Sequence, residues 1–168
     1  TPRLFDVMAR CPHVAKQLHL PFQSGSSRVL KAMNRHYDRE TYLEKVNYAK
    51  SVMPQLVLTS DVIVGFPGET EEEFEETVSL IQQVHYDSLF TFIFSPRVGT
   101  PAAGMDDPTP KAEKSRRFDR LCAVQNAISE EIHTGYIGRE LRCLVDGREG
   151  EKLTARTEGG RLVRFAGE

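Results

Sequence analysis

The chain has 168 residues, enough for one domain of ordinary size or for part of a domain with a small appendage. An apolar fraction of 39% with a charged fraction of 27% is typical of globular proteins and excludes wholesale disorder. The formal net charge is -2, so any contact with RNA must come from a local basic patch and not from the overall field. No apolar run approaches the roughly 18 residues needed to span a bilayer.

The first half of the chain alternates between helical and strand-like patterns. Apolar spacing predicts a helical end over 4–8, a short strand near 15–21, a helical turn capped by Ser27, and a helix from Asp38 to Pro54. Residues 56–64 are apolar and β-branched with little alternation, as expected of a strand covered on both faces.

The middle of the chain repeats this order. Thr70 and Glu73 form a capping box, which predicts that a helix begins there. Residues 88–95 have the pattern of another buried strand, and the aromatic residues at 90, 92 and 94 share one face, which favours a packed core face. Strand and helix thus alternate three times, and this predicts three parallel strands joined by helical crossovers.

The sequence pattern changes near Gly138, where a long helix that opens at Pro110 ends. Beyond it, apolar residues alternate with polar neighbours at 141, 143 and 145, at 153 and 155, and at 163 and 165. Turns are expected at Asp146-Gly147 and Gly159-Gly160, between short antiparallel strands. We expect a second module over 138–168, too small to hold a core of its own, that leans on the helical body.

The three cysteines, Cys11, Cys122 and Cys143, lie far apart and form no CxxC pair. Such a set is poor evidence for a metal site or a disulfide framework. We expect reduced thiols in a cytoplasmic protein, and no metal ligand in this chain.

Three strings of residues at strand ends could carry chemistry. The first string is His19-Leu-Pro-Phe-Gln-Ser-Gly-Ser with Arg28-Val-Leu-Lys-Ala-Met-Asn-Arg35 behind it. In it, the amide of Gln23 and the hydroxyl of Ser24 could bind ribose hydroxyls or a carboxylate. On these residues alone, a helix cap by Ser26 or Ser27 is the simpler account. In Asp61-Val-Ile-Val-Gly-Phe-Pro-Gly-Glu-Thr, glycines let the backbone approach a flat ring, although a tight turn without ligand explains the string equally well. The third string is Phe90-Thr-Phe-Ile-Phe-Ser-Pro-Arg-Val-Gly-Thr-Pro-Ala.

In order and spacing, these strings resemble the radical S-adenosylmethionine (SAM) methylthiotransferases, nearest the branch that acts on isopentenyladenosine at position 37 beside the tRNA anticodon. The resemblance implies an α/β fold: residues 1–137 would be the carboxyl-terminal half of a partial (β/α)6 TIM-like barrel. Residues 138–168 would begin a small RNA-binding β-barrel of the TRAM type. In this family a deoxyadenosyl radical made from SAM abstracts hydrogen before a methylthio group is added.

The resemblance also assigns cofactors and partners. It implies SAM and two [4Fe–4S] clusters in the full-length protein, but the CxxxCxxC cluster motif is absent from this chain, which we expect to be inactive alone. Implied partners are a tRNA substrate, a sulfur donor and an electron donor; we expect a monomer and no membrane.

The resemblance assigns site residues in the same way. Those implied for SAM are Gln23 and Ser24 at the ribose, Arg35 at the methionyl carboxylate, and Ile63, Val64 and Gly65 at the adenine. Those implied for RNA are Arg97, Arg161 and Arg164. No catalytic residue is implied within this chain. His19 is expected to pack against or orient a neighbour. Many radical SAM relatives have glutamate where Gly68 stands; here Glu69 comes one position later, a form usual for the methylthiotransferases, and its role is left open.

Two alternatives remain at this point. One is an enzyme that acts on threonylcarbamoyladenosine instead, although the third string favours isopentenyladenosine. The other is a non-catalytic RNA-binding module, and a CxxxCxxC motif upstream would distinguish the enzyme from it.

Overall fold

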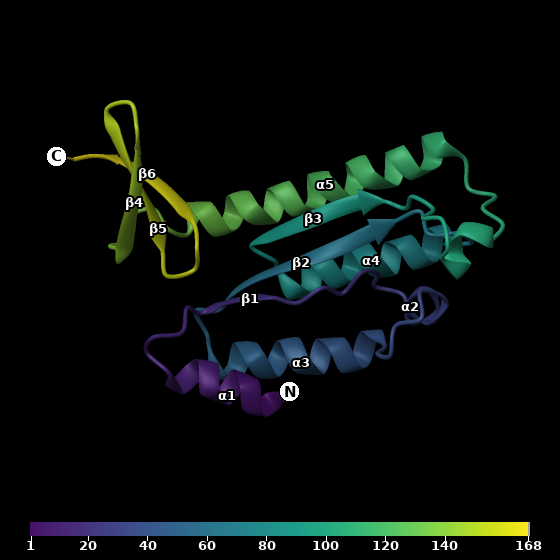
Figure 1. The fold of residues 1–168 in the computed structure, drawn as a ribbon, viewed down its shortest axis with the longest axis horizontal. Coiled ribbons are helices and arrows are strands. Elements are labelled where there is room, and N and C mark those ends of the chain that lie inside the picture. Colours follow the sequence, from purple (N-terminus) through teal and green to yellow (C-terminus); the bar gives the residue numbers. More distant parts are fainter. Residues whose placement is uncertain (168) are drawn as a thin grey trace.

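The computed structural model describes residues 1–167 (Figure 1). The elements in chain order are α1 (Pro2–Arg10), β1 (Gln17–His19), α2 (Ser27–Ala32), α3 (Arg39–Val52), β2 (Val57–Val64), α4 (Glu71–Val84), β3 (Ser88–Ile93), the short 3-10 helix η1 (Pro101–Gly104), α5 (Lys111–Thr134), β4 (Cys143–Glu149), β5 (Lys152–Thr157) and β6 (Leu162–Ala166). None of the described helices is both long and apolar enough to cross a bilayer.

The first three strands form one parallel sheet in the order β1-β2-β3. Gln17 pairs with Val57, and Thr59 pairs with Ser88, so all three strands run in the same direction. Helical segments connect them, which confirms the predicted parallel sheet. The capping box is also confirmed, because the Thr70 side chain accepts from the Glu73 N–H and the Glu73 carboxylate accepts in return from the Thr70 N–H.

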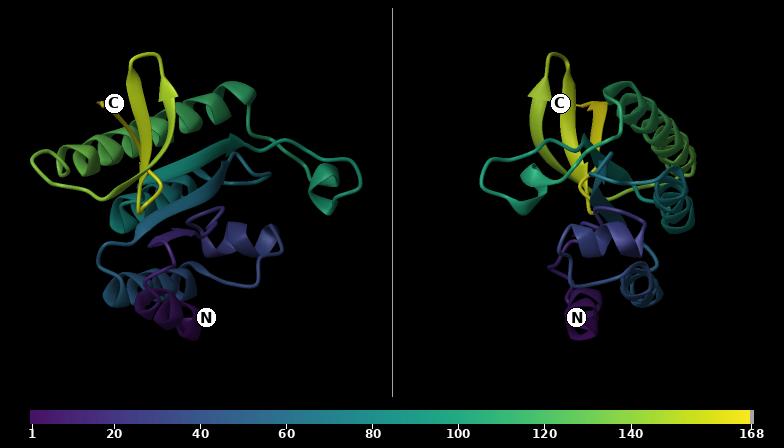
Figure 2. Two further views of the ribbon diagram at one scale, coloured as in Figure 1. Left: turned by 60° about the vertical axis from the view of Figure 1, so that its left-hand side comes forward. Right: turned by 90° about the vertical axis from the view of Figure 1, so that its right-hand side faces the viewer.

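One face of this sheet is covered and the other is open. Helices α3, α4 and α5 lie on the covered face, where Leu58, Val62 and Val64 pack into the core (Figure 2). Phe90 and Phe92 point to the other face and are 55% and 52% exposed. Two expectations were therefore wrong: β2 is not covered on both faces, and the aromatic face of β3 is not a packed core face. No described element covers that face.

The last three strands form a separate antiparallel sheet in the order β4-β5-β6, here called the tail sheet. Its antiparallel pairing and the turn at Gly159-Gly160 are confirmed. The expected turn at Asp146-Gly147 is wrong, because both residues lie inside β4, where the register shifts between Val145 and Gly147. A Cβ on Gly147 would lie 2.9 Å from the Thr154 hydroxyl, so this glycine serves a bulge in the strand rather than a turn.

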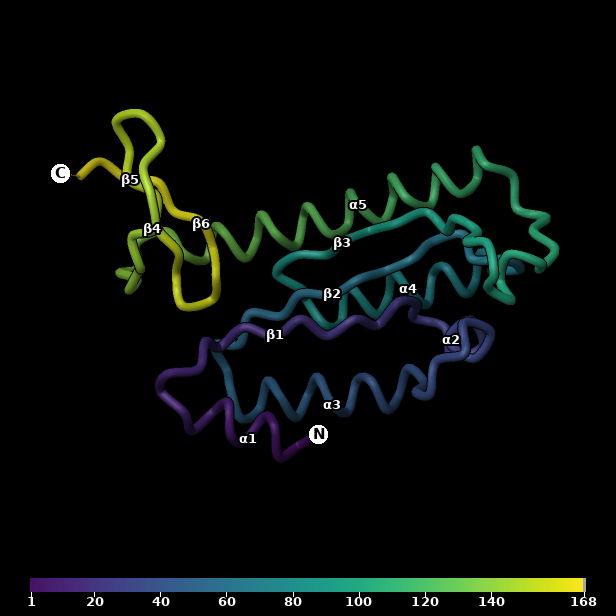
Figure 3. Tube along the Cα trace, viewed as in Figure 1, coloured from purple at the N-terminus to yellow at the C-terminus, as the bar shows by residue number. Residues whose placement is uncertain are grey.

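The two ends of the parallel sheet face different parts of the chain. The tail sheet lies beyond the amino ends of the strands, and the loop that contains η1 lies beyond their carboxyl ends (Figure 3). The strings that carry the resemblance end at the carboxyl side.

Candidate functional site

The segment after β1 continues to pair with β2. Gln23 forms a parallel bridge with Val62: its N–H donates to the Asp61 carbonyl at 3.0 Å, and its own carbonyl accepts from Ile63 at 2.9 Å. Its φ of 67° lies in the left-handed region, which is uncommon for a residue other than glycine. The residue is 7% exposed, and its side-chain amide hydrogen-bonds to no residue within 1–167. The amide atoms are not fully enclosed by protein, so a ligand at the carboxyl ends of the strands can reach them.

The next residues are fixed against α4. The Gly25 N–H donates to the Thr77 hydroxyl at 2.8 Å, and a Cβ on Gly25 would lie 2.4 Å from the Thr77 Cα. Ser24 is fully buried, and its hydroxyl accepts from the Ser26 N–H at 3.2 Å. The Ser24 side chain therefore faces the helix, not the open side of the sheet. Ser26, and not Ser27, occupies the N-cap position of α2, without a capping side-chain bond.

The loop after β2 is braced by a buried carboxylate. The Gly65 N–H donates to Glu69 at 2.7 Å, and Arg117 of α5 donates to the same carboxylate oxygen at 3.2 Å. Burial raises the pKa of Glu69, while these two donors oppose the rise. Gly65 has a φ of +69°, a left-handed backbone conformation that glycine adopts without steric conflict. Glu69 thus has a structural role in shaping the loop, which the sequence had left open.

Arg28 joins the first two strings. It donates to the Gly68 carbonyl at 2.6 Å and forms two bonds with Glu73, one of them at 2.6 Å. Sequence reasoning missed both Arg28 and Arg117. The presence of Arg28 within the first string was the only signal, because its partner lies 45 residues away.

These loops border a cavity of about 540 Å³ at the carboxyl ends of β2 and β3. Its lining residues come from all three strings: Gln23, Arg35, Asp61, Ile63, Phe92, Ile93, Phe94, Ser95, Arg97, Thr100 and Ala102. Four predicted site residues, Gln23, Arg35, Ile63 and Arg97, therefore meet there. Val64 does not, because its side chain points into the core on the opposite face.

The charges around this cavity favour an anion. Neither Arg35 nor Arg97 forms an ion pair within residues 1–167, whereas Arg28, Arg116 and Arg117 are each bound to a glutamate. Two free guanidinium groups at one cavity can bind a carboxylate or a phosphate.

His19 lies next to this cavity on the open face. Its Nδ1 is 2.9 Å from the Thr59 hydroxyl, and its Nε2 is 3.4 Å from the Asp61 carboxylate that lines the cavity. This geometry agrees with the expectation that His19 orients a neighbour.

The other two arginines proposed for RNA lie elsewhere. Arg161 is bound to Asp87, and Arg164 pairs with Glu149 at 2.7 Å within the tail sheet. Neither shares the cavity with Arg97. In the described part of the chain, no three His, Cys, Asp or Glu side chains are placed to hold a metal ion, and the three cysteines are free.

Comparison with known proteins agrees with this geometry. Residues 1–81 match the model of the radical SAM superfamily. The chain is 48% identical over its whole length to the tRNA-2-methylthio-N(6)-dimethylallyladenosine synthase of Clostridium botulinum, of which it covers 38%. The resemblance to radical SAM methylthiotransferases is confirmed.

Synthases of the same name from other bacteria agree with this result. The synthase of Alkaliphilus oremlandii is 46% identical over 99% of this chain, which covers 36% of that synthase. That of Desulfitobacterium hafniense is 47% identical over 99% of this chain, which covers 38% of it. The chain thus spans less than two fifths of the length of these relatives.

Proposed function

We propose that this chain is part of an enzyme that adds a methylthio group to N(6)-dimethylallyladenosine (isopentenyladenosine) in tRNA, beside the anticodon. The observation that supports this most is the cavity where Gln23, Arg35, Ile63 and Arg97 meet. The names of the relatives favour this nucleoside over threonylcarbamoyladenosine. A non-catalytic RNA-binding module is less favoured, because two of the three candidate RNA-binding arginines are already ion-paired.

The cavity fits SAM in its chemistry. Arg35 offers a guanidinium for the methionyl carboxylate, Gln23 offers an unpartnered amide for ribose hydroxyls, and Ile63 offers an apolar surface for adenine. Ser24, Val64 and Gly65 would contribute through the backbone of the two loops, since the Ser24 and Val64 side chains are buried. When bound, SAM would supply the radical that removes hydrogen from the substrate.

Iron–sulfur clusters do not fit the residues that the structure describes. Cys11, Cys122 and Cys143 are separate free thiols, and no described group of side chains could ligate a cluster. We derive no step through a cluster, and assign the two [4Fe–4S] clusters, with the sulfur and electron donors, to the remainder of the full-length protein. We propose that this protein is a cytoplasmic monomer.

The same proposal covers the two modules. Residues 1–137 would belong to a partial (β/α)6 barrel, whose interior is the open face that carries Phe90 and Phe92. Residues 138–168 would begin a TRAM-type RNA-binding module.

The SAM site can be tested by calorimetry on the full-length protein. Arg35→Ala should weaken SAM binding about tenfold or more, because a hydrogen bond to a charged group contributes roughly 1.5–3 kcal/mol. Gln23→Ala should have a smaller effect, and Arg35→Lys should retain part of the affinity. Arg120→Ala is the matched control, since Arg120 is exposed and pairs with Glu75 away from the cavity. Unchanged affinity in both Arg35→Ala and Gln23→Ala would reject this assignment of the cavity.

A further inference from the structure

The turn between β5 and β6 packs against the amino ends of the parallel sheet. Gly159 and Gly160 lie against Val57 and Gln17, which are the first residues of β2 and β1 and pair with each other. A Cβ on Gly159 would lie 2.2 Å from a Val57 methyl carbon, and one on Gly160 would lie 2.6 Å from the Gln17 amide oxygen. Only residues without a side chain allow this approach.

Arg161 follows this turn and holds it against the body through an ion pair and contacts with two rings. Its guanidinium binds the Asp87 carboxylate and the His133 ring, and it lies over the Tyr136 ring at 5.2 Å from the centroid. Its side chain is 16% exposed and that of Asp87 is 12% exposed. A largely desolvated guanidinium that is paired and stacked has little capacity left for a phosphate.

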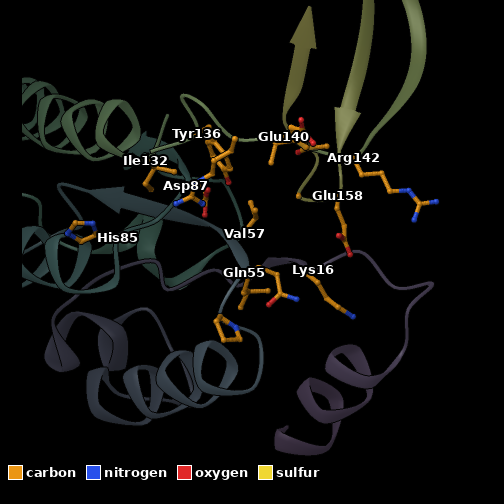
Figure 4. Close-up of a pocket in the computed structure, with 16 residues that line it drawn as sticks. Lys16, Gln55, Val57, His85, Asp87, Ile132, Tyr136, Glu140, Arg142 and Glu158 are labelled. Carbon is orange, nitrogen blue, oxygen red and sulfur yellow. The ribbon is translucent and has the colours of Figure 1, made fainter. Parts of the chain in front are cut away.

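Asp87 joins this contact to the rest of the body. Its second carboxylate oxygen accepts from the Leu58 N–H of β2 at 3.0 Å, and its carbonyl accepts from the Ser129 hydroxyl of α5 at 3.1 Å. One residue thus connects β2, β3, α5 and the tail sheet. A cavity of about 460 Å³ lies beside it, between Val57 of the body and Glu158 of the tail (Figure 4).

Arg164 differs from Arg161 in each of these respects. It lies three residues further along the same strand region, but its partner Glu149 is in the tail sheet, and both side chains are about half exposed. It makes no hydrogen bond or ion pair to the body among residues 1–167.

We propose that residues 157–161 form an interdomain lock, in which Arg161 is a positioning residue that sets the orientation of the tail sheet. Arg161 then acts on RNA only indirectly, through the placement of the tail sheet, while Arg164, whose pair with Glu149 is exposed to solvent, can exchange that partner for a phosphate. The RNA part of this inference rests on the proposed function, whereas the lock itself does not.

The lock can be tested by distance measurements between two spin labels. The full-length protein would carry a ketone-bearing unnatural amino acid in place of Glu151, in the turn between β4 and β5, and of Gln82 on α4, both of which are exposed. The spin label reacts with the ketone, so the cysteines of the protein, including those that ligate clusters, stay unlabelled. We expect one narrow distance distribution in this background and in Arg164→Ala. Arg161→Ala and Gly159→Ala should each broaden it, the first by removing the ion pair and the second by steric conflict with Val57. Arg161→Lys should restore part of the narrow population.

Loss of the tail sheet itself is a separate outcome that must be distinguished. Amide exchange at Ala155, which is fully buried in β5, reports whether that sheet persists. If Arg161→Ala unfolds the tail sheet, the label distances in Gly159→Ala and Arg161→Lys test the lock in its place. Distributions as narrow as that of Arg164→Ala in all variants that keep the sheet would overturn the lock.

RNA binding across a salt series gives the second measurement. Removing one side chain that binds an RNA phosphate lowers the slope of log affinity against log salt concentration by about one unit. We expect that decrease for Arg164→Ala, whereas Arg161→Ala should weaken binding with the slope unchanged. A slope lowered by one unit in Arg161→Ala would overturn its positioning role. Absence of any RNA binding would reject the proposed function, while the label distances would still test the lock.

Discussion

At the scale of single residues, arginines that pair with buried or largely buried carboxylates join segments that are distant in sequence. Arg28 binds Glu73 and Gly68, Arg117 binds Glu69, and Arg161 binds Asp87. Each pair spans 40 residues or more, so no local pattern in the sequence predicts it. The sequence identified Gln23, Arg35 and Ile63 because these residues lie inside recognisable strings.

The Arg28–Glu73 pair predicts a dependence of stability on pH. The hydrogen bond from Arg28 is the largest cause that lowers the pKa of Glu73. A lowered folded-state pKa stabilises the protein above about pH 4.3, the usual value for glutamate, and this contribution is lost as the pH falls through the folded-state pKa. Arg28 is half exposed, so we expect Arg28→Gln to cost about 1 kcal/mol or less at pH 7.

Urea denaturation at pH 7 and near pH 3 would measure this contribution. The difference between the wild type and Arg28→Gln should shrink toward acid pH. Arg3→Gln serves as a control, because Arg3 is exposed and forms no ion pair within residues 1–167, so the same loss of charge removes no carboxylate partner. A difference that stays constant with pH would contradict the assignment.

At the scale of elements, the two faces of β2 could not be distinguished by hydrophobicity. Ser60 is polar yet lies on the covered face, because its hydroxyl accepts from the Phe22 N–H at 2.9 Å and donates to the Leu20 carbonyl at 2.7 Å. Ile63 is apolar yet lies on the open face, beside the cavity. The order and direction of the strands were predictable from alternation with helices, whereas the covered face depended on these tertiary contacts.

Substitutions on the two faces of the sheet should therefore differ in how much they lower the free energy of unfolding. In the 168-residue chain, Phe74→Ala removes a fully buried ring between α4 and the sheet and should cost about 3–5 kcal/mol. Phe90→Ala removes a ring that is more than half exposed and should change the free energy of unfolding by about 1 kcal/mol or less. Chemical denaturation of both variants measures this contrast. Equal losses would mean that the open face is covered in solution.

At the scale of the whole molecule, the candidate site and the tail sheet occupy opposite ends of the parallel sheet. Parallel strands bring their carboxyl ends to one edge, so the meeting of the three strings at one cavity was predictable in principle. The position of the tail was not, since its docking depends on Arg161 and Asp87, which are 74 residues apart. β2 has eight residues, and at about 3.3 Å per residue it separates the two ends by roughly 26 Å.

The separation of the cysteines gives a prediction for the whole chain. After anaerobic reconstitution with iron and sulfide, this 168-residue chain should show no stoichiometric iron–sulfur absorption, because its three free thiols cannot converge on one cluster. Iron and sulfide analysis would measure this, with the full-length protein as the positive control. Stoichiometric incorporation that survives gel filtration would contradict the prediction.

The open sheet face has a practical consequence for work with the isolated chain. In the described structure, β1 and β3 each pair on one side only, so each leaves a sheet edge open to another strand, and on β3 that edge lies beside the exposed Phe90 and Phe92. With a net charge of only -2, electrostatic repulsion between copies is weak. We therefore expect copies of this chain to associate through the open sheet face at high concentration. Its solubility, and not the stability of its fold, will then limit spectroscopy and crystallisation.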